Sequence, residues 1–71
     1  GRDGAPQVSI AFVRSRIRTM IEGERRGAPL TDAAIVKRLA GHGVRISRRT
    51  VAKYRAQLGL PGAPERRRRA E

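Results

Sequence analysis

The chain has 71 residues, a formal net charge of +11 and no cysteine, and its only aromatic residues are one Phe and one Tyr. A chain this short forms one small domain, and its core must be aliphatic. The lack of cysteine excludes disulfides and thiolate metal sites, while a single histidine argues against a zinc cluster or a His-based triad. No paired carboxylates, phosphate loop or activated nucleophile are visible. We therefore expect no enzyme, metal or cofactor, and a cytoplasmic setting without membrane spans.

Basic residues dominate the second half of the sequence. Seventeen Lys and Arg stand against six Asp and Glu, and no acid lies between residues 33 and 64. The cations of this stretch are Lys37, Arg38, Arg45, Arg48, Arg49, Lys53 and Arg55. Such a field supplies the salt-dependent part of polyanion binding. It favours nucleic acid over an anionic membrane, because the basic helices lack the wide apolar face of interfacial helices.

The first expected helix follows a polar lead-in, residues 1–7, which we expect to be disordered. Ser9 is placed as its N-cap, and apolar residues then recur at helical spacing. This core stripe consists of Ile10, Val13, Ile17, Met20 and Ile21. Phe12 falls outside the stripe, and we expect helix tilt to bring it partly inward rather than leave it as a docking contact. Residues 23–29 read as a polar loop.

The second expected helix begins at Thr31, whose hydroxyl can cap the first turn, and Asp32 complements the positive helix end. Its buried side should comprise Ile35, Val36, Leu39 and Ala40, with Lys37 and Arg38 pointing outward. Gly43 can take a left-handed conformation and end the helix.

Residues 47–58 form the third expected helix, with Ser47 as N-cap and Gly59 as the stop. Its core side is Val51, Tyr54 and Leu58, and its outward side is Arg49, Ala52, Lys53 and Ala56. A helix in the DNA major groove needs this mixture, since small residues allow close approach and long cations reach guanine O6 and N7 or a phosphate. For an isolated helix, a solvated basic face is an equal alternative.

Together these elements predict an all-α fold, a small three-helix domain over residues 8–61 that contains a helix-turn-helix. Residues 62–71 have no apolar face, so we expect a disordered basic tail, either in contact with phosphate or simply solvated.

The expected DNA-contacting residues lie mainly in the third helix. The helical wheel nominates Arg49 and Lys53 as base readers, and Arg48 is the next candidate because the first turn approaches the bases most closely. Contacts to the DNA backbone are expected from Arg55, Thr50, Tyr54, Lys37 and Arg38. For Tyr54 a core position of the ring is the alternative, and for Thr50, Lys37 and Arg38 it is a solvated side chain.

The segment Arg48-Arg49-Thr50-Val51-Ala52-Lys53-Tyr54-Arg55 resembles the RpoN box, the signature of bacterial sigma-54 factors. The ten-residue pattern of that family is Ala-Arg-Arg-Thr-Val-Ala-Lys-Tyr-Arg-Glu, so this chain departs from it at Ser47 and Ala56. Ser47 improves the cap, whereas Ala56 removes an acid from the outward face. The similarity covers essentially residues 8–61.

This resemblance implies the DNA-binding domain of a sigma-54 factor of the bacterial, nucleoid-associated transcription machinery. Its recognition helix, residues 47–58, would enter the major groove of the upstream minus-24 promoter element, read a GG and position RNA polymerase on double-stranded promoter DNA. Core polymerase and the ATP-driven activator would be partners only through other parts of a longer parent protein.

Two other classes remain open from the residues alone. A transposase or repressor helix-turn-helix can also carry an Arg-rich recognition helix. A basic RNA-binding module is the other alternative, although the near absence of aromatic residues for base stacking counts against it.

Overall fold

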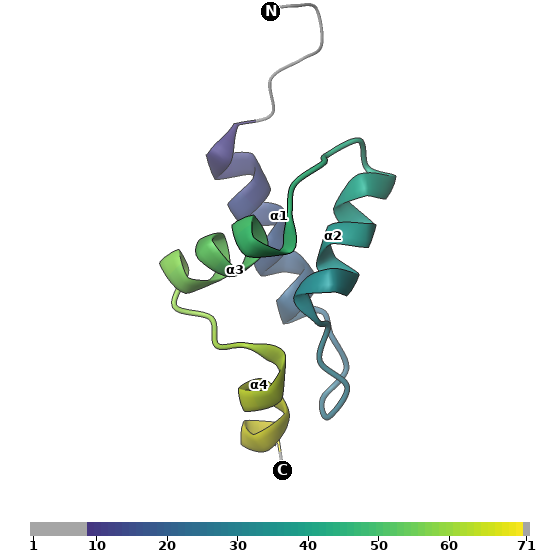
Figure 1. Cartoon of the computed structure of the whole chain (residues 1–71). Coiled ribbons are helices and arrows are strands. Elements are labelled where there is room, and N and C mark those ends of the chain that lie inside the picture. The colour runs from purple at the N-terminus through teal and green to yellow at the C-terminus, as the bar shows by residue number, and fades with distance from the viewer. Residues whose placement is uncertain (1–8, 71) are drawn as a thin grey trace, which may run out of the picture.

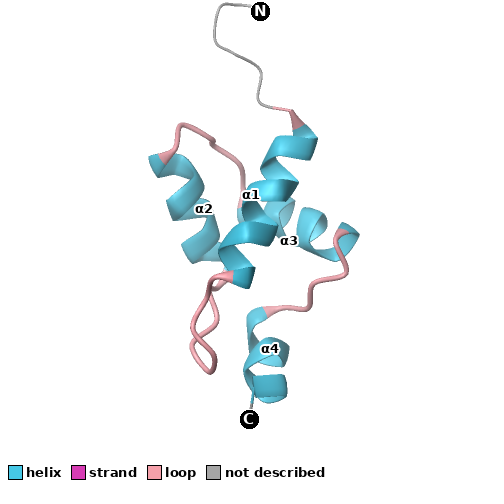
Figure 2. Cartoon of the chain, turned by 180° about the vertical axis from the view of Figure 1, so that it is seen from behind, coloured by secondary structure: helices cyan, strands magenta, loops and turns pink. Residues whose placement is uncertain are grey.

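A computed structural model describes residues 9–70, which fold into four α-helices without a β-strand among them. The helices are α1 (Ile10–Glu22), α2 (Asp32–Gly41), α3 (Arg48–Gln57) and α4 (Ala63–Ala70). In Figure 1, α3 lies across the front of α1, α2 stands beside them and α4 lies below α3. From behind, α1 is in front of α3 (Figure 2). The all-α class with a helix-turn-helix is therefore confirmed, with α2 and α3 as its two helices. The predicted lead-in, residues 1–7, lies outside the described residues.

Hydroxyl caps start the first three helices. The Ser9 Oγ accepts a hydrogen bond from the Phe12 N–H at 3.0 Å, and the Thr31 Oγ1 accepts one from Ala34 at 3.1 Å. The Ser47 Oγ accepts one from the Thr50 N–H at 3.1 Å. Each bond satisfies a backbone donor that has no partner within the helix, which is why the helices begin where the sequence indicates.

Left-handed glycines end α2 and α3. Gly43 has a φ of 83° and Gly59 a φ of 73°. After each of them the chain turns back, and the Val44 N–H donates to the Leu39 carbonyl at 2.9 Å while the Leu60 N–H donates to the Arg55 carbonyl at 3.0 Å. These bonds are those of a Schellman motif, which only a residue tolerant of positive φ allows.

The core lies where α1, α2 and α3 meet. Its buried members are Val13, Ile17, Ile21, Ile35, Leu39, Val44 and Val51. Two residues of the first turn of α1 depart from expectation, since Ile10 is 54% exposed and Phe12 is 50% exposed. The reason is positional, because this turn extends beyond the part of α1 that α3 crosses (Figure 1). Helix tilt does not bury Phe12.

The C-terminal segment differs from the predicted disordered tail, because residues 63–70 form α4. Its start and end suit a helix: Pro64 and Glu65 lie in the first turn, and arginines follow in the last turn, near the negative helix end. Arg69 donates to Glu65 one turn away at 2.7 Å. The decisive contacts are made by Arg66, which binds residues far away in the sequence, so the helical unit extends past residue 61.

Across residues 9–70 no helix is both long enough and apolar enough to cross a membrane.

Candidate nucleic-acid interface

The outward face of α3 is cationic and carries no carboxylate. Arg48, Arg49 and Lys53 are all exposed, while Val51 on the opposite side of the helix is completely buried. Ala52 is half-buried and Ala56 is exposed, so small side chains lie between the cations. The structure thus brings the three predicted base readers onto one accessible face.

This face begins at the junction of the two helices of the helix-turn-helix. An open groove separates the first turns of α2 and α3, and Thr31, Asp32, Ala33, Ser47, Arg48 and Arg49 line it. Both helices direct their N-terminal N–H groups and partial positive charge toward this end, which favours an anion nearby. Arg48 and Arg49 add their positive charge at this end of α3.

Two residues of α3 that are predicted to contact the DNA backbone also make contacts within the protein. The Thr50 hydroxyl lies 3.0 Å from the Ser47 hydroxyl, so it belongs to the capping arrangement, and its side chain is half-buried. Tyr54 is half-buried and packs against the core. These contacts fix the helix beneath the cationic face and do not test the predicted phosphate contacts.

Arg55 has a different environment from the one expected for a phosphate contact. Its Nε and Nη2 donate to the two carboxylate oxygens of Asp32, each at 3.1 Å, and its Nη1 donates to the Leu60 carbonyl at 3.1 Å. The Arg55 side chain is only 15% exposed. All three guanidinium nitrogens thus face protein acceptors, and this geometry gives Arg55 a positioning role. Arg55 fixes α3 to the start of α2 and to the turn that follows α3.

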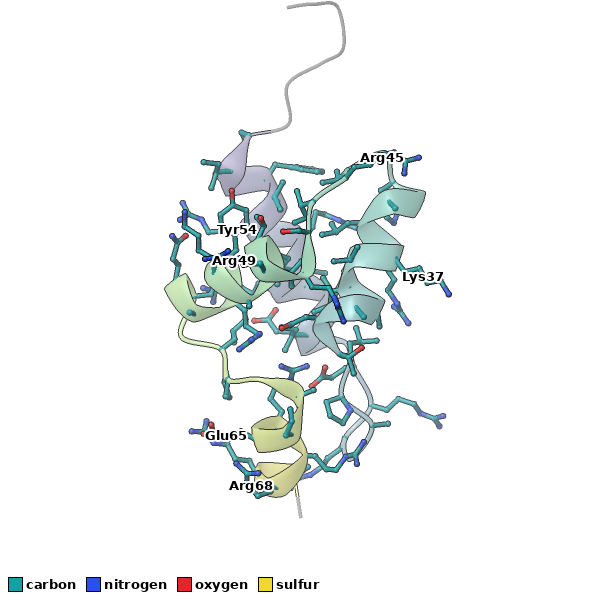
Figure 3. All side chains as sticks on the ribbon, in the orientation of Figure 1. Lys37, Arg45, Arg49, Tyr54, Glu65 and Arg68 are labelled. Atoms are coloured by element: carbon teal, nitrogen blue, oxygen red, sulfur yellow. The ribbon has the colours of Figure 1, made fainter. Side chains whose placement is uncertain are left out.

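The two cations predicted on α2 lie apart from the α3 face. Lys37 is exposed and points away from α3, and Arg45 lies in the connection between the two helices (Figure 3). Arg38 is exposed beside the end of α1, where it lines a hollow with Met20 and Leu30. Any contact of Lys37 or Arg38 with DNA would therefore be with backbone outside the site that α3 faces.

A second arginine–carboxylate pair, which the sequence does not predict, attaches α4 to the rest of the domain. Arg66 donates from Nε to Glu24 Oε2 at 2.7 Å and from Nη2 to Oε1 at 2.9 Å. It also donates to the Pro61 and Leu30 carbonyls, each at 2.6 Å. The side chains of Arg66 and Glu24 are 10% and 11% exposed. A bidentate pair this well buried is a strong, directional link between α4 and the loop that joins α1 to α2.

The Glu24 carboxylate is kept ionised by this arrangement. Burial alone would raise its pKa, but hydrogen bonds from Arg66 and from the Leu30 N–H, together with the positive charge of Arg66, hold the pKa of Glu24 below its ordinary value.

The local sequence signal that could have revealed α4 is Pro64-Glu65 followed by arginines, a helix start with a favourable last turn. Nothing local in the sequence indicates the partner of Arg66.

The comparison with protein families decides which class of helix-turn-helix this is. The model of the family described as "Sigma-54, DNA binding domain" matches residues 1–68. The chain belongs to this family.

Sigma-54 factors of several bacteria are similar to this chain over most of its length. RNA polymerase sigma-54 factor 1 of Bradyrhizobium diazoefficiens is 47% identical over 66 residues, which cover 93% of this chain and 14% of that protein. The factor of Rhizobium meliloti is 54% identical over 60 residues, 84% of this chain and 12% of that protein. The factor of Rhodobacter capsulatus is 49% identical over 70 residues, 99% of this chain and 16% of that protein. No solved structure matches the chain.

As a sigma-54 DNA-binding domain, the chain spans only 12–16% of the length of these three relatives. Its DNA-binding character agrees with the cationic face of α3. The RpoN-box residues 48–55 make up most of α3. The residues that carry the resemblance are therefore those that form the exposed cationic face of α3 and those that pack α3 against the rest of the domain.

Proposed function

We propose that this chain is the promoter-binding module of a sigma-54 factor and that α3 reads the GG of the upstream minus-24 promoter element in the major groove. The observation that carries the proposal is the acid-free face of α3, on which Arg48, Arg49 and Lys53 are exposed together. Binding at this element positions RNA polymerase for transcription initiation. Core polymerase and the ATP-driven activator are engaged by other parts of a longer parent protein, and this module performs no catalysis.

Within this proposal, Arg49 and Lys53 read bases. They are four residues apart on α3, about one helical turn, and so lie on the same face. A guanidinium or ammonium group can donate to guanine O6 and N7, and a bidentate arginine contributes about 1–3 kcal/mol of discrimination against another base. Arg48, one position closer to the start of the helix, assists at the bases or at the adjoining phosphate. Thr50, Tyr54, Lys37 and Arg38 contact the DNA backbone.

The test compares binding to duplexes that differ only in the GG. Arg49→Ala is expected to weaken binding to a GG duplex by about 1–3 kcal/mol, roughly 5- to 150-fold, and to leave binding to a scrambled duplex much less affected. Lys37→Ala is the matched comparison: it removes one exposed cation that is proposed to contact the backbone, so any loss of affinity is expected to be equal on the two duplexes, because phosphates carry no sequence information. Fluorescence anisotropy at fixed salt gives both affinities. Equal losses on the two duplexes for Arg49→Ala would overturn the assignment of Arg49 as a base reader.

A selection of binding sites from random duplexes tests the element itself. The proposal requires enrichment of sites that contain the GG. An enriched site without it would favour a helix-turn-helix with a different target, and tighter binding to structured RNA than to any duplex would refute promoter binding.

A further inference from the structure

The four arginines of α4 fall into two pairs with different surroundings. Arg66 is bound to Glu24, and Arg69 donates to Glu65 within the helix at 2.7 Å. Arg67 and Arg68 are exposed, and neither forms an ion pair with another residue in the range 9–70. Arg66 therefore attaches α4 to the rest of the domain, and Arg69 is exposed but bound to Glu65, whereas Arg67 and Arg68 present their charge to solvent.

The exposed pair borders a groove that continues toward the α3 face. This groove is lined by Pro29, Thr31, Ala63, Pro64, Arg67 and Arg68. Thr31, the N-cap of α2, also lines the groove that contains Arg48 and Arg49. Thr31, at the start of α2, thus belongs to the walls of both grooves, one of which carries arginines of α3 and the other arginines of α4. In Figure 3, Arg68 lies on α4 below α3, and Arg49 lies on α3 above it.

The position of α4 is fixed before any ligand binds. The Arg66 guanidinium donates to Glu24 and Leu30 in the loop before α2 and to Pro61 in the connection before α4. Because these bonds join α4 to the same loop that leads into α2, they hold Arg67 and Arg68 at a set place relative to Thr31. A preorganised pair of cations loses less conformational entropy on binding than a mobile tail would.

We propose that α4 is a second DNA-contacting element, in which Arg67 and Arg68 bind backbone phosphates on one flank of the base pairs that α3 reads. The inference rests on the proposed function of α3 and extends the interface beyond the helix-turn-helix. Duplex DNA is the occupant that the surface favours, since both sets of arginines flank grooves that share Thr31 and guanidinium groups bind phosphate in bidentate fashion. Such contacts set the register of the protein on the duplex without reading sequence.

The experiment uses the 71-residue chain, the double variant Arg67→Ala/Arg68→Ala and a charge-matched control, Arg16→Ala/Arg18→Ala. The control residues lie on α1, which is on the opposite side of the molecule from the exposed face of α3 (Figures 1 and 2). Both double variants remove two positive charges. Alanine keeps the helical propensity of arginine, and the far-ultraviolet circular dichroism of each variant checks that α4 and α1 remain folded.

Affinities are measured between 50 and 200 mM salt on a GG duplex and a scrambled duplex. Loss of two phosphate contacts lowers the salt exponent by about 1.8, so the advantage of the wild-type chain over the α4 variant shrinks about 12-fold across this fourfold range of salt. The loss is the same on both sequences. The control is expected to change affinity by less than about threefold, because charges farther than about 10 Å from the duplex are largely screened.

Changing the length of the duplex distinguishes a contact at one flank from a general effect of positive charge. Shortening the duplex on one flank is expected to lower wild-type affinity to that of the α4 variant and to leave the variant unchanged, whereas shortening the other flank affects both proteins alike. If the α4 variant and the control lose equal affinity, or if shortening and substitution lower affinity independently on both flanks, α4 makes no such contact. A loss confined to structured RNA would also overturn the proposal.

The two proposals can fail separately. A wild-type chain that binds GG and scrambled duplexes equally refutes base reading by α3, while the comparison of the two flanks still tests the contact made by α4.

Discussion

Arg55→Ala is expected to destabilise the fold and not to remove a phosphate contact. The side chains of Arg55 and Asp32 are 15% and 27% exposed and share two hydrogen bonds of 3.1 Å, and Arg55 makes a third bond to the Leu60 carbonyl. Breaking a fully buried pair costs about 3–5 kcal/mol, while an exposed pair contributes about 0–1 kcal/mol. The partial exposure here places the expected loss at about 2–3 kcal/mol, and in a domain of this size that lowers the Tm by roughly 10–20 °C.

Thermal and urea unfolding of four proteins measures this loss: wild type, Arg55→Ala, Asp32→Asn and the double variant. If the two residues stabilise the fold through one another, the double variant loses less than the sum of the single losses, by about 1–2 kcal/mol. Arg48→Ala is the matched control, because it removes an exposed arginine from the same helix and is expected to change stability by less than about 0.5 kcal/mol.

For phosphate contacts the expected order of the two variants is opposite to that for stability: Arg48→Ala has the larger effect and Arg55→Ala the smaller. At a temperature where both are folded, Arg48→Ala should lower the salt exponent by up to about 0.9 if it contacts a phosphate, whereas Arg55→Ala should leave the exponent unchanged. Arg55→Ala should instead reduce the preference for GG over scrambled duplex, because α3 is no longer fixed to the start of α2. Unchanged stability together with a lower salt exponent for Arg55→Ala would refute the positioning role and restore Arg55 as a phosphate contact.

Two further predictions concern the supports of the helices. Because the pKa of Glu24 is below its ordinary value, Glu24 adds stability above a pH of about 4.5, and this contribution is lost as the pH falls through the lowered folded-state pKa. Acid titrations of the wild type and Glu24→Gln, followed by circular dichroism, should differ in that range, and identical profiles would contradict the prediction. Gly43→Ala places a Cβ at a φ of 83° and is expected to cost about 1–2 kcal/mol. Gly41→Ala, in helical backbone with nothing within 4 Å of the added Cβ, should be neutral or stabilising by up to about 1 kcal/mol, so equal unfolding free energies would contradict the role of Gly43.

The parts of the fold that could be predicted from the sequence are those fixed by local chemistry. Ser9, Thr31 and Ser47 cap helices because a hydroxyl reaches an N–H group three residues ahead, and that spacing is visible in the sequence. Gly43 and Gly59 end helices because few other residues accept a positive φ. The cationic face of α3 follows from helical periodicity, which sorts Arg49 and Lys53 away from Val51.

The parts that could not be predicted depend on contacts between distant residues. Residues 62–71 have no apolar face, which predicts a disordered tail, but Arg66 is paired with Glu24, 42 positions earlier. The basic sequence of α3 predicts a phosphate contact for Arg55, yet Asp32, 23 positions earlier, binds its guanidinium. Helical periodicity predicts the face of the helix on which a side chain lies. It contains no information about which acid of another segment lies next to that face.

The chain has few acids, so their positions determine which arginines form ion pairs within the domain. Glu24 binds Arg66, Asp32 binds Arg55 and Glu65 binds Arg69, and these three pairs stabilise the domain. Residues 33–64 contain no acid, so α3 offers no carboxylate of its own to its cations. At position 56, where the sigma-54 pattern has Glu, this chain has Ala, which leaves Lys53 without an acid three residues further along the helix.

The net charge of +11 is therefore not a uniform field. Carboxylates pair with the arginines that fix α3 and α4 in place, whereas five exposed cations of these two helices form no ion pair with another residue in the range 9–70: Arg48, Arg49, Lys53, Arg67 and Arg68. An acid moved to the outward face of α3 would leave the net charge unchanged and still weaken attraction to phosphate, since charges within a Debye length of the duplex dominate the interaction. The placement of the acids, and not the net charge alone, therefore determines which cations are left to attract phosphate.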